Sequence, residues 1–542
     1  MWQTGWREKV WSVLDQPWDI IIVGGGITGA GILREASRLG LRTLLLEARD
    51  FSSGTSSRSS KLVHGGFRYL KNAQLKVTLQ SVSERERLLK EGRGLVTQLG
   101  FLMPVYATDK YPAWLLGMGL SLYDLLAFDW KHRYYRPQDL LELCPCLSQR
   151  GLKGGYRFFD AQTDDARLVL RLIRESLNEN SLALNYAQVC HLLTNNNGQV
   201  RGVVVNDVAD ESFPRQAEVK AGIVINATGA WADNLRITQG FEPKLRKLRG
   251  SHIVFPFHRL PITRAISFWH PRDHRPVFAL PWEGVTLFGT TDVEQAAPLP
   301  WEPRPSPAEI EYLLLAINHI FPQQDLAFED IQACFAGIRP VVATGKTDPS
   351  KESREHILLC EDGMLTITGG KLTTFRLMAR DTLQSACSLL GKNIQVYFSK
   401  CVLDPISVEI LSEIDIKPSV KTRILGRYGP DAPAIMNMGA GDDFEEIDSS
   451  KNLWVELRWV ARHEGVVHLD DLLFRRVRLG LLLPQGGSNI FGKIREYIQP
   501  ELGWTDDRWS SEVIRYMQLW QCGYSTENTI GTTVSSISRE DI

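Results

Sequence analysis

Two histidines stand in sequence surroundings that suit acid–base chemistry. His64 is followed by Gly65 and Gly66, and His252 lies within the segment GSHIVF. Histidine titrates near neutral pH, and the two glycines leave room beside His64 for a planar ring or a small substrate. A single histidine is more often a structural residue. The sequence therefore favours His64 as the base and predicts that one of the two histidines contacts the substrate.

Three basic residues each follow a turn that contains glycine, an arrangement that suits the binding of an anion. They are Arg68 in GGFR, Arg339 in AGIRP and Lys371 in GGK. If the three cations converge on one cleft, they would bind a phosphate or a carboxylate. The alternative, three unrelated surface cations, stays open because the chain has 62 lysines and arginines.

A base and an anion clamp are two of the three elements that the oxidation of an unactivated secondary alcohol requires. The third is a hydride acceptor, which a bound organic cofactor supplies. The elements that would position all three begin with a short β-branched run at residues 20–23, which predicts a buried parallel strand.

A glycine-rich turn follows that strand. Gly24 allows a tight bend, Gly26 lets the backbone approach a pyrophosphate, and Gly29 lets the next helix pack closely against the strand. The N-terminus of this helix, predicted over residues 30–40, then faces the negative charge. Together these features are typical of a phosphate-binding turn.

The acid that belongs in such a unit is also present. Residues 43–46 are predicted as the second strand, which ends at Glu47, 21 residues after Gly26. A carboxylate at this spacing binds a ribose hydroxyl and favours a bare ribose over a 2′-phosphate. Strand, turn, helix, strand and acid in register predict a dinucleotide site.

Three further segments extend the predicted site. A hydroxyl-rich loop at residues 52–60 offers donors for a pyrophosphate or an isoalloxazine ring, although such a loop is more often a plain linker. Residues 221–229 predict another buried strand, which ends at Gly229. Residues 364–374 predict a third strand, which ends at a glycine pair before a helix whose N-terminus can face an anion.

Composition bounds the class of protein. A chain of 542 residues exceeds a single hydrophobic core, so two or three domains are expected. The net charge of −1 gives no reason to expect nucleic-acid binding. The eight cysteines are scattered, and the one close pair, Cys144 and Cys146, has the wrong spacing for a redox or zinc motif. No metal site is predicted, and a reduced cytosolic compartment is expected.

One apolar segment suggests contact with a membrane surface. The N-terminus lacks a secretory signal, and no run of about 18 apolar residues predicts a spanning helix. Residues 114–128 are strongly apolar, however, and basic residues flank them on both sides, as in interfacial helices. The alternative is a buried helix of a substrate domain. The tryptophan-rich start of the chain, Trp2, Trp6 and Trp11, is equally ambiguous.

Taken together, the motifs resemble those of flavin-dependent glycerol-3-phosphate dehydrogenases. The resemblance runs from about residue 18 to residue 400 and continues into the helical segment from Trp459 to Leu483. The serine-rich loop that runs into HGGFRYL is the most specific part, since many flavoproteins share the first glycine motif. The motifs are GGGITGAG, GTSSRSSKLVHGGFRYL, DDARLVL, INATGAWAD, GSHIVF, FGTTDVE, GIRP and GGKLTTFR.

The resemblance implies an α/β fold with a Rossmann-like FAD-binding domain of the glutathione-reductase and amino-acid-oxidase type. A mixed, β-rich substrate domain and an all-helical C-terminal domain accompany it. The expected boundaries are 18–90, 155–245 and 330–395 for the discontinuous FAD domain, 91–154 and 246–329 for the substrate domain, 400–524 for the helical domain, and 525–542 for a disordered tail.

The resemblance also implies roles for individual residues. The expected activity is oxidation of sn-glycerol 3-phosphate to dihydroxyacetone phosphate, with electrons passing to a membrane quinone or, alternatively, to oxygen. His64 would lie beside the flavin as base or orienter, and Arg68, His252, Arg339 and Lys371 would hold the substrate. The residues expected to contact FAD are Gly24, Gly26, Gly29, Glu47, Thr55, Ser56, Ser57, Ser60, Gly229, Gly370, Leu372 and Thr373.

Location and partners follow from the same resemblance. A cytoplasmic protein on the inner face of the plasma membrane is expected, and a homodimer is one alternative for its assembly. Three rival functions stay open: a flavin amine or amino-acid oxidase, a non-catalytic flavin-binding module, and a soluble NAD-dependent dehydrogenase. A substrate carboxylate would replace the phosphate in the first, and the segments at residues 221–229 and 364–374 would be surplus in the last.

Overall fold

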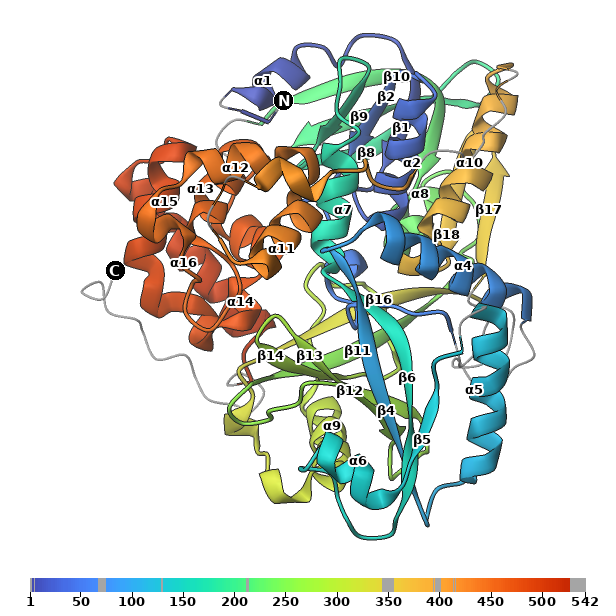
Figure 1. Ribbon diagram of the computed structural model, residues 1–542. Coiled ribbons are helices and arrows are strands. Elements are labelled where there is room, and N and C mark those ends of the chain that lie inside the picture. The colour runs from blue at the N-terminus through green and yellow to red at the C-terminus, as the bar shows by residue number, and fades with distance from the viewer. Residues whose placement is uncertain are drawn as a thin grey trace.

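The chain folds into two β-sheets and a helical domain (Figure 1). The computed structural model describes residues 2–3, 5–66, 75–127, 130–210, 214–343, 355–392, 394, 401–412, 414 and 416–526. In Figure 1 the first sheet lies at the top, the second sheet lies below it, and the C-terminal helices lie at the left.

The first sheet is built around the apolar strand β1, which has neighbours on both sides and is buried. It pairs in parallel with β2 and β10, so that Ile20 lies opposite Thr43 on one side and Ile223 on the other. The described strands follow the order β17-β18-β10-β1-β2-β7, with β9 paired to β10 and β8 paired to β9. Their bounds are β1 Trp18–Val23, β2 Thr43–Leu46, β7 Ser181–Leu184, β8 Ala187–Thr194, β9 Val200–Asp207, β10 Gln216–Asn226, β17 His356–Glu361 and β18 Met364–Gly369.

Helices cover this sheet as a Rossmann-like unit requires. Helix α2 begins directly after the glycine turn and packs against α10 and α7. Gly31 permits that approach, because a Cβ there would lie 2.6 Å from the ring of Phe375. The helices on this part of the chain are α1 Trp6–Trp11, α2 Ile27–Arg38, α7 Asp165–Arg174, α8 Ala232–Ile237 and α10 Phe375–Leu389. The predicted Rossmann-like α/β unit is present in this architecture.

The second sheet is mostly antiparallel. Its described strands follow the order β15-β11-β14-β13-β12-β4-β6-β3, with β16 attached to β11 and β5 attached to β6. Both β6 and β16 belong here, although residues 155–163 and 330–342 were predicted within the FAD domain. The bounds are β3 Leu62–Val63, β4 Val96–Tyr106, β5 Arg133–Tyr135, β6 Leu152–Thr163, β11 Leu245–Pro256, β12 Ala265–Trp269, β13 Pro276–Trp282, β14 Val285–Gly289, β15 Val293–Glu294 and β16 Ala333–Val342. The accompanying helices are α4 Leu75–Glu91, α5 Ala113–Ala127, α6 Pro137–Leu143 and α9 Pro307–Ile320.

The C-terminal domain is helical, as predicted. Its helices are α11 Pro418–Tyr428, α12 Ala432–Met438, α13 Trp454–His463, α14 Leu479–Leu482, α15 Phe491–Leu502 and α16 Asp506–Gly523. The helical segment expected to run on to Leu483 is interrupted instead. It divides into a π-helical turn over Asp471–Arg476 and the short α14, because Arg478 adopts a left-handed φ of 64° between them.

Buried ion pairs join the C-terminal domain to the FAD domain. Asp50, just after β2, accepts hydrogen bonds from Arg475 and Arg476 of the π-helical turn. Arg167 of α7 makes a bidentate pair with Glu464, at 2.7 and 2.8 Å. All of these side chains are buried, so the helical domain is locked against the side of the FAD domain that carries the serine-rich loop.

The two ambiguous apolar segments differ in their environment. Trp2 and Trp6 are buried, and Trp2 stacks on Phe51 with ring centroids 5.1 Å apart. Helix α5, in contrast, exposes 64% of Trp114, 61% of Met118 and 60% of Leu125. Among the described helices, none combines the length and the hydropathy that crossing a bilayer requires.

Candidate active site

A cavity of about 400 Å³ lies where β1, β2 and β10 end, at the C-terminal edge of the parallel strands. Ligands of open α/β sheets bind at this edge. Six of the predicted cofactor residues line the cavity: Gly24, Gly26, Glu47, Thr55, Ser56 and Gly229.

The glycine turn is shaped by close backbone contacts. Gly24 has a φ of +113°, and a Cβ on it would lie 2.6 Å from the carbonyl oxygen of Ala227. A Cβ on Gly29 would lie 1.9 Å from the carbonyl oxygen of Gly24, so the close packing of α2 on β1 depends on this glycine. At Gly26 the nearest atom would be the Oγ of Ser56 at 3.0 Å. The open side of Gly26 is therefore the cavity, which fits a pyrophosphate beside the N-terminus of α2.

Glu47 lines the cavity in the position predicted for the ribose acid. Its carboxylate accepts backbone N–H groups from Gly25 at 2.6 Å and from Arg49 at 2.9 Å. Burial raises the pKa of Glu47, and these two hydrogen bonds oppose that shift. The backbone thus fixes the direction of the carboxylate at the end of β2.

The serine-rich loop divides its side chains between the cavity and the protein interior. The Oγ of Ser56 accepts the N–H of Ile27 at 2.9 Å, and the hydroxyl of Thr55 donates to the carbonyl of Ile338 on β16. Ser57 and Ser60 do not line this cavity. Ser60 contacts His252 instead, with 2.8 Å between Oγ and Nε2.

His252 and Arg339 form one group of predicted substrate residues. His252, on β11, is buried and stacks on Phe335. Burial, with Arg339 and Lys61 nearby, holds the pKa of His252 well below its usual value, so the ring is neutral. Arg339, on β16, donates to Asp292 at 3.1 Å and to the hydroxyl of Thr290 at 2.9 Å.

His64 and Lys371 belong to a second group, where the HGG loop meets the end of β18. The hydroxyl of Thr373 donates to the carbonyl of His64 at 3.4 Å, and the Nζ of Lys371 lies 3.3 Å from the Oγ of Ser81 on α4. Gly370 has a φ of +68°, and a Cβ there would meet Met378 at 2.5 Å. Arg68 lies outside the described residues.

Comparison with known proteins decides the family. A family model for FAD-dependent oxidoreductases matches residues 19–376, and one for the C-terminal domain of alpha-glycerophosphate oxidase matches residues 387–509. An aerobic glycerol-3-phosphate dehydrogenase of Staphylococcus saprophyticus is 32% identical over 501 residues, which cover 87% of this chain and 88% of that protein. The chain belongs to the FAD-dependent glycerol-3-phosphate dehydrogenase family.

Solved structures agree with this placement. The glycerol-3-phosphate dehydrogenase from Bacillus halodurans, complexed with FAD, has a TM-score of 0.77 and 25% identity, and the match covers 96% of this chain and 98% of that one. The L-alpha-glycerophosphate oxidase from Mycoplasma pneumoniae, with FAD bound, has a TM-score of 0.55 and 17% identity over 72% of this chain and 99% of that one. The latter likeness shows the fold alone. The predicted family and the FAD cofactor are confirmed.

For a member of this FAD-dependent family, the cavity has the donors that the nucleotide part of the cofactor requires. The start of α2 and the hydroxyl of Ser56 would hold the pyrophosphate, and Glu47 would hold the ribose. The predicted FAD contacts Gly370, Leu372 and Thr373 lie instead at the end of β18 beside His64. These residues are far in sequence from the nucleotide-binding turn, and they would contact the reactive part of the cofactor.

Sequence reasoning missed several lining residues of this FAD dehydrogenase. Arg49 follows the ribose acid, and its guanidinium lies 6.0 Å from the ring of Trp301. Trp231 stacks on Trp301 at 5.3 Å, and both line the cavity. Trp231 follows the recognisable ATGAW segment, whereas Trp301 lies in a loop before α9 that carries no local signal.

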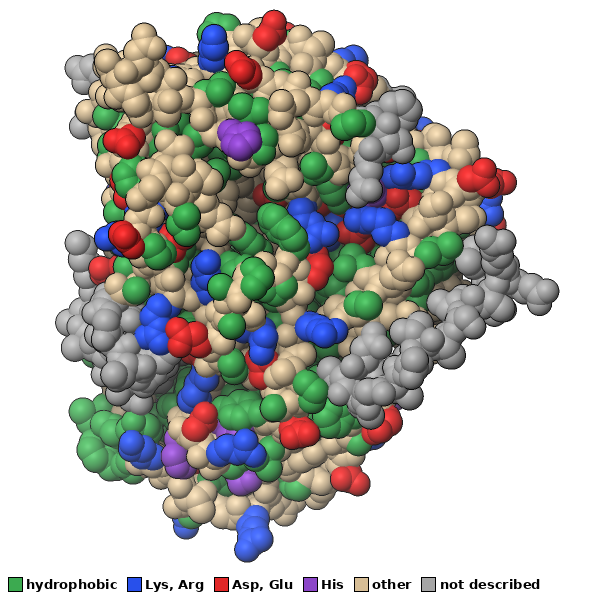
Figure 2. Space-filling model, turned by 180° about the vertical axis from the view of Figure 1, so that it is seen from behind, with side chains coloured by type: hydrophobic (Ala, Val, Ile, Leu, Met, Phe, Trp, Pro, Cys, Tyr) green, Lys and Arg blue, Asp and Glu red, His purple; other side chains and the backbone are tan. Residues whose placement is uncertain are grey.

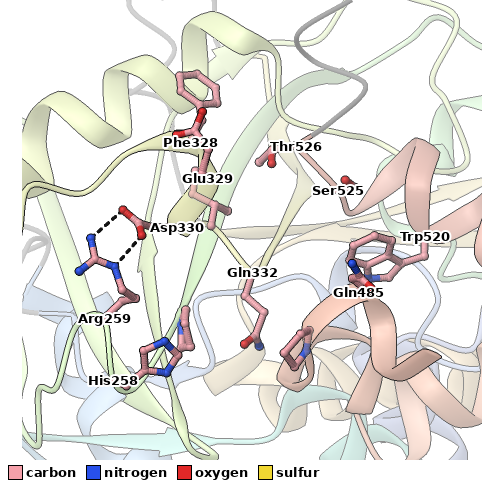
Figure 3. A pocket seen from close by; sticks show the side chains of 13 residues that line it. His258, Arg259, Phe328, Glu329, Asp330, Gln332, Gln485, Trp520, Ser525 and Thr526 are labelled. Atoms are coloured by element: carbon pink, nitrogen blue, oxygen red, sulfur yellow. Dashed lines mark hydrogen bonds and ion pairs between the residues drawn. The ribbon is translucent and has the colours of Figure 1, made fainter. Parts of the chain in front are cut away.

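A second cavity, of about 480 Å³, lies between the second sheet and the C-terminal domain (Figure 3). Ser525 and Thr526 line it, whereas residues 527–542 of the predicted disordered tail lie outside the described residues. Its arginine, Arg259, forms a bidentate pair with Asp330, at 2.5 and 2.8 Å. Because Asp330 already neutralises the charge of Arg259, this second cavity suits the phosphates of a dinucleotide less well than the first cavity does.

Proposed function

We propose that the chain oxidises sn-glycerol 3-phosphate to dihydroxyacetone phosphate. The observation that supports this proposal is the contact between the two strands that carry Arg339 and Lys371. Arg339 lies on β16 of the second sheet and Lys371 follows β18 of the first sheet; these strands contact each other, and a Cβ on Gly369 would lie 3.6 Å from Val342 at the end of β16. A dianionic phosphate is the substrate group that two such cations bind best.

Each residue has a distinct task in this reaction. Arg339 and Lys371 hold the phosphate and so bring C2 into position. His64 accepts the proton of the C2 hydroxyl while a hydride leaves C2, and FAD, when bound, supplies the hydride acceptor. His252 stays neutral, and its Nε2 holds the hydroxyl of Ser60, the last residue of the serine-rich loop.

A membrane quinone is the electron acceptor in this proposal, and α5 supports it. The side chains of Trp114, Met118 and Leu125 form an exposed apolar stripe on this helix, and the exposed cations Lys131 and Arg133 follow it in the chain. In Figure 1, α5 lies at the right-hand margin, and Figure 2 shows hydrophobic side chains gathered at the corresponding left-hand margin. An apolar stripe bordered by cations suits an anionic bilayer surface, where a quinone dissolves. The inner face of the plasma membrane and a homodimer stay predictions.

Oxygen is the second candidate acceptor. The observation that favours it is the match of residues 387–509 to the C-terminal domain of alpha-glycerophosphate oxidase. Both candidates share the same substrate half-reaction and differ only in how the reduced cofactor returns its electrons.

An anaerobic titration of the purified yellow protein with sn-glycerol 3-phosphate tests the proposal. We expect loss of the visible flavin absorbance, followed by its return when a short-chain quinone analogue is admitted. Faster return with oxygen would assign the oxidase instead. Flavin that stays bound and oxidised with glycerol 3-phosphate, but is bleached by an amine or an amino acid, would overturn the proposed substrate.

A further inference from the structure

The residue after His64 is held by a buried carboxylate that the proposed reaction does not use. The N–H of Gly65 donates to the Oδ1 of Asp160, on β6, at 3.1 Å. Asp160 is 6% exposed. A buried carboxylate is stable only if hydrogen bonds and opposite charges replace the water that it has lost. The partners of Asp160 therefore indicate its role.

Those partners come from two helices. Arg85, on α4, donates from Nη1 to Asp160 at 3.2 Å and to the hydroxyl of Tyr123 at 2.6 Å. Tyr123, on α5, donates from its hydroxyl to the Oδ2 of Asp160 at 3.4 Å. The carboxylate thus joins β6, α4, α5 and the HGG loop at one point.

Packing fixes the loop as tightly as the hydrogen bonds do. A Cβ on Gly65 would lie 2.2 Å from the hydroxyl oxygen of Tyr123 and 2.8 Å from the Cγ2 of Val82. The backbone of Gly65 therefore rests directly on Tyr123. His64, its neighbour, can move away from the cofactor side only if this contact or the Asp160 hydrogen bond changes.

We propose that Asp160, together with Tyr123, is a positioning residue that holds the His64 loop in its reactive place. This inference rests on the proposed function, because it assigns a task to the base of that reaction. Asp160 does not touch the substrate. It acts through the amide of Gly65, and Arg85 keeps the carboxylate charged and correctly turned.

The test compares variants of the FAD-loaded enzyme in turnover of glycerol 3-phosphate with a soluble dye as electron acceptor. Asp160→Ala removes the acceptor of the Gly65 amide, so we expect kcat to fall by about 10- to 100-fold, with KM and FAD content little changed. Asp160→Asn keeps an oxygen that accepts that amide, and its NH₂ group can donate to the hydroxyl oxygen of Tyr123 in place of the bond that Tyr123 donates to Asp160, so kcat should recover to within about threefold of wild type.

Two further variants keep the inference testable if Asp160→Ala does not fold. Tyr123→Phe removes one hydrogen bond and should lower kcat by roughly two- to tenfold. Gly65→Ala forces a methyl group against Tyr123 and should lower kcat more. Tyr428→Phe is the matched control, because it also removes a buried tyrosine hydroxyl from a carboxylate, Glu456, but within the C-terminal domain. We expect its kcat to be unchanged.

The outcomes separate this inference from the proposed function. Wild-type enzyme that does not turn over glycerol 3-phosphate, or a His64→Ala variant with full turnover, would remove the proposed function and its base. An active wild type with equal kcat values in Asp160→Ala, Asp160→Asn and Tyr428→Phe would overturn the positioning role alone. Equal losses in the Ala and Asn variants would do the same, because the hydrogen bond to Gly65 would then be irrelevant.

Discussion

The Nζ of Lys61 lies 2.9 Å from the Oδ2 of Asp165, and neither side chain is exposed to solvent. Lys61 directly follows the serine-rich loop, and Asp165 begins α7. Arg478, from the C-terminal domain, joins the pair by donating to Asp165 at 3.3 Å and to the carbonyl of Ser57 at 2.8 Å. The serine-rich loop is therefore anchored by buried charges that come from three parts of the chain.

Removal of the carboxylate from this cluster should destabilise the protein strongly. Asp165→Ala leaves Lys61 buried without its anion, and breaking a buried pair in this way costs about 3–5 kcal/mol. Urea unfolding should show that loss, and FAD content should fall because the serine-rich loop loses its anchor. Asp431→Ala is the control, since it breaks a more exposed pair with Arg174 and should cost less than about 1 kcal/mol. Equal losses in both variants would contradict the anchoring role.

The same pair makes stability depend on pH in a defined direction. Burial, reinforced by Arg478, lowers the pKa of Lys61 from 10.5 to about 7. Between these two values the unfolded chain binds a proton that the folded chain does not, so stability rises with pH across this window, by up to about 1.4 kcal/mol per pH unit. The free energy of unfolding of wild type minus that of Lys61→Met should therefore increase from pH 7 to pH 9. A flat or falling difference would show that Lys61 stays protonated.

Local patterns predicted the first βαβ unit well. The strand at residues 43–46 was predicted with the bounds that the structure has, and Gly24, Gly26 and Glu47 line the cavity. These features arise within one short βαβ unit, where hydrophobic period and glycine positions decide the structure.

Features that depend on distant residues were not predictable in this way. At the break in the C-terminal helix, Arg478 donates to the carbonyl of Ser57, 421 positions away in the chain, and no local pattern indicates such a contact. The sequences of β6 and β16 would suit a strand of either sheet. Only the strand pairing in the structure assigns them to the second sheet. Trp301 enters the FAD cavity from a loop, and no local pattern marks such a residue.

The two cations of the proposed phosphate site should affect binding of substrate rather than of cofactor. Arg339→Ala and Lys371→Ala should each keep FAD but raise KM for glycerol 3-phosphate by roughly 10- to 150-fold, the worth of a charge-assisted hydrogen bond. Steady-state kinetics with a soluble acceptor measures this. Arg259→Ala, in the second cavity, removes an arginine paired with Asp330 and should leave KM unchanged. If all three variants behave alike, the phosphate site lies elsewhere.

The apolar stripe of α5 should be required for binding to lipid. Replacement of Trp114, Met118 and Leu125 by serine removes three exposed apolar side chains and should weaken sedimentation with anionic phospholipid vesicles by at least about tenfold. The matched control replaces three apolar side chains that are exposed elsewhere, Ile237, Leu389 and Ile514, by serine. Equal binding by the two triple variants would exclude α5 as the contact.

Two glycines three positions apart should respond differently to the same added methyl group. In Gly29→Ala the methyl would lie 1.9 Å from the carbonyl of Gly24, so α2 must move and stability should fall by about 1–3 kcal/mol, with loss of FAD. In Gly26→Ala the φ of −81° suits alanine, and the nearest atom is the Oγ of Ser56 at 3.0 Å. The methyl there points toward the cavity, so FAD content should fall while the urea midpoint of the cofactor-free protein stays near wild type. Flavin absorbance per mole of protein, measured beside that midpoint, separates the two effects, and a Gly26→Ala variant with full FAD would place the pyrophosphate away from this turn.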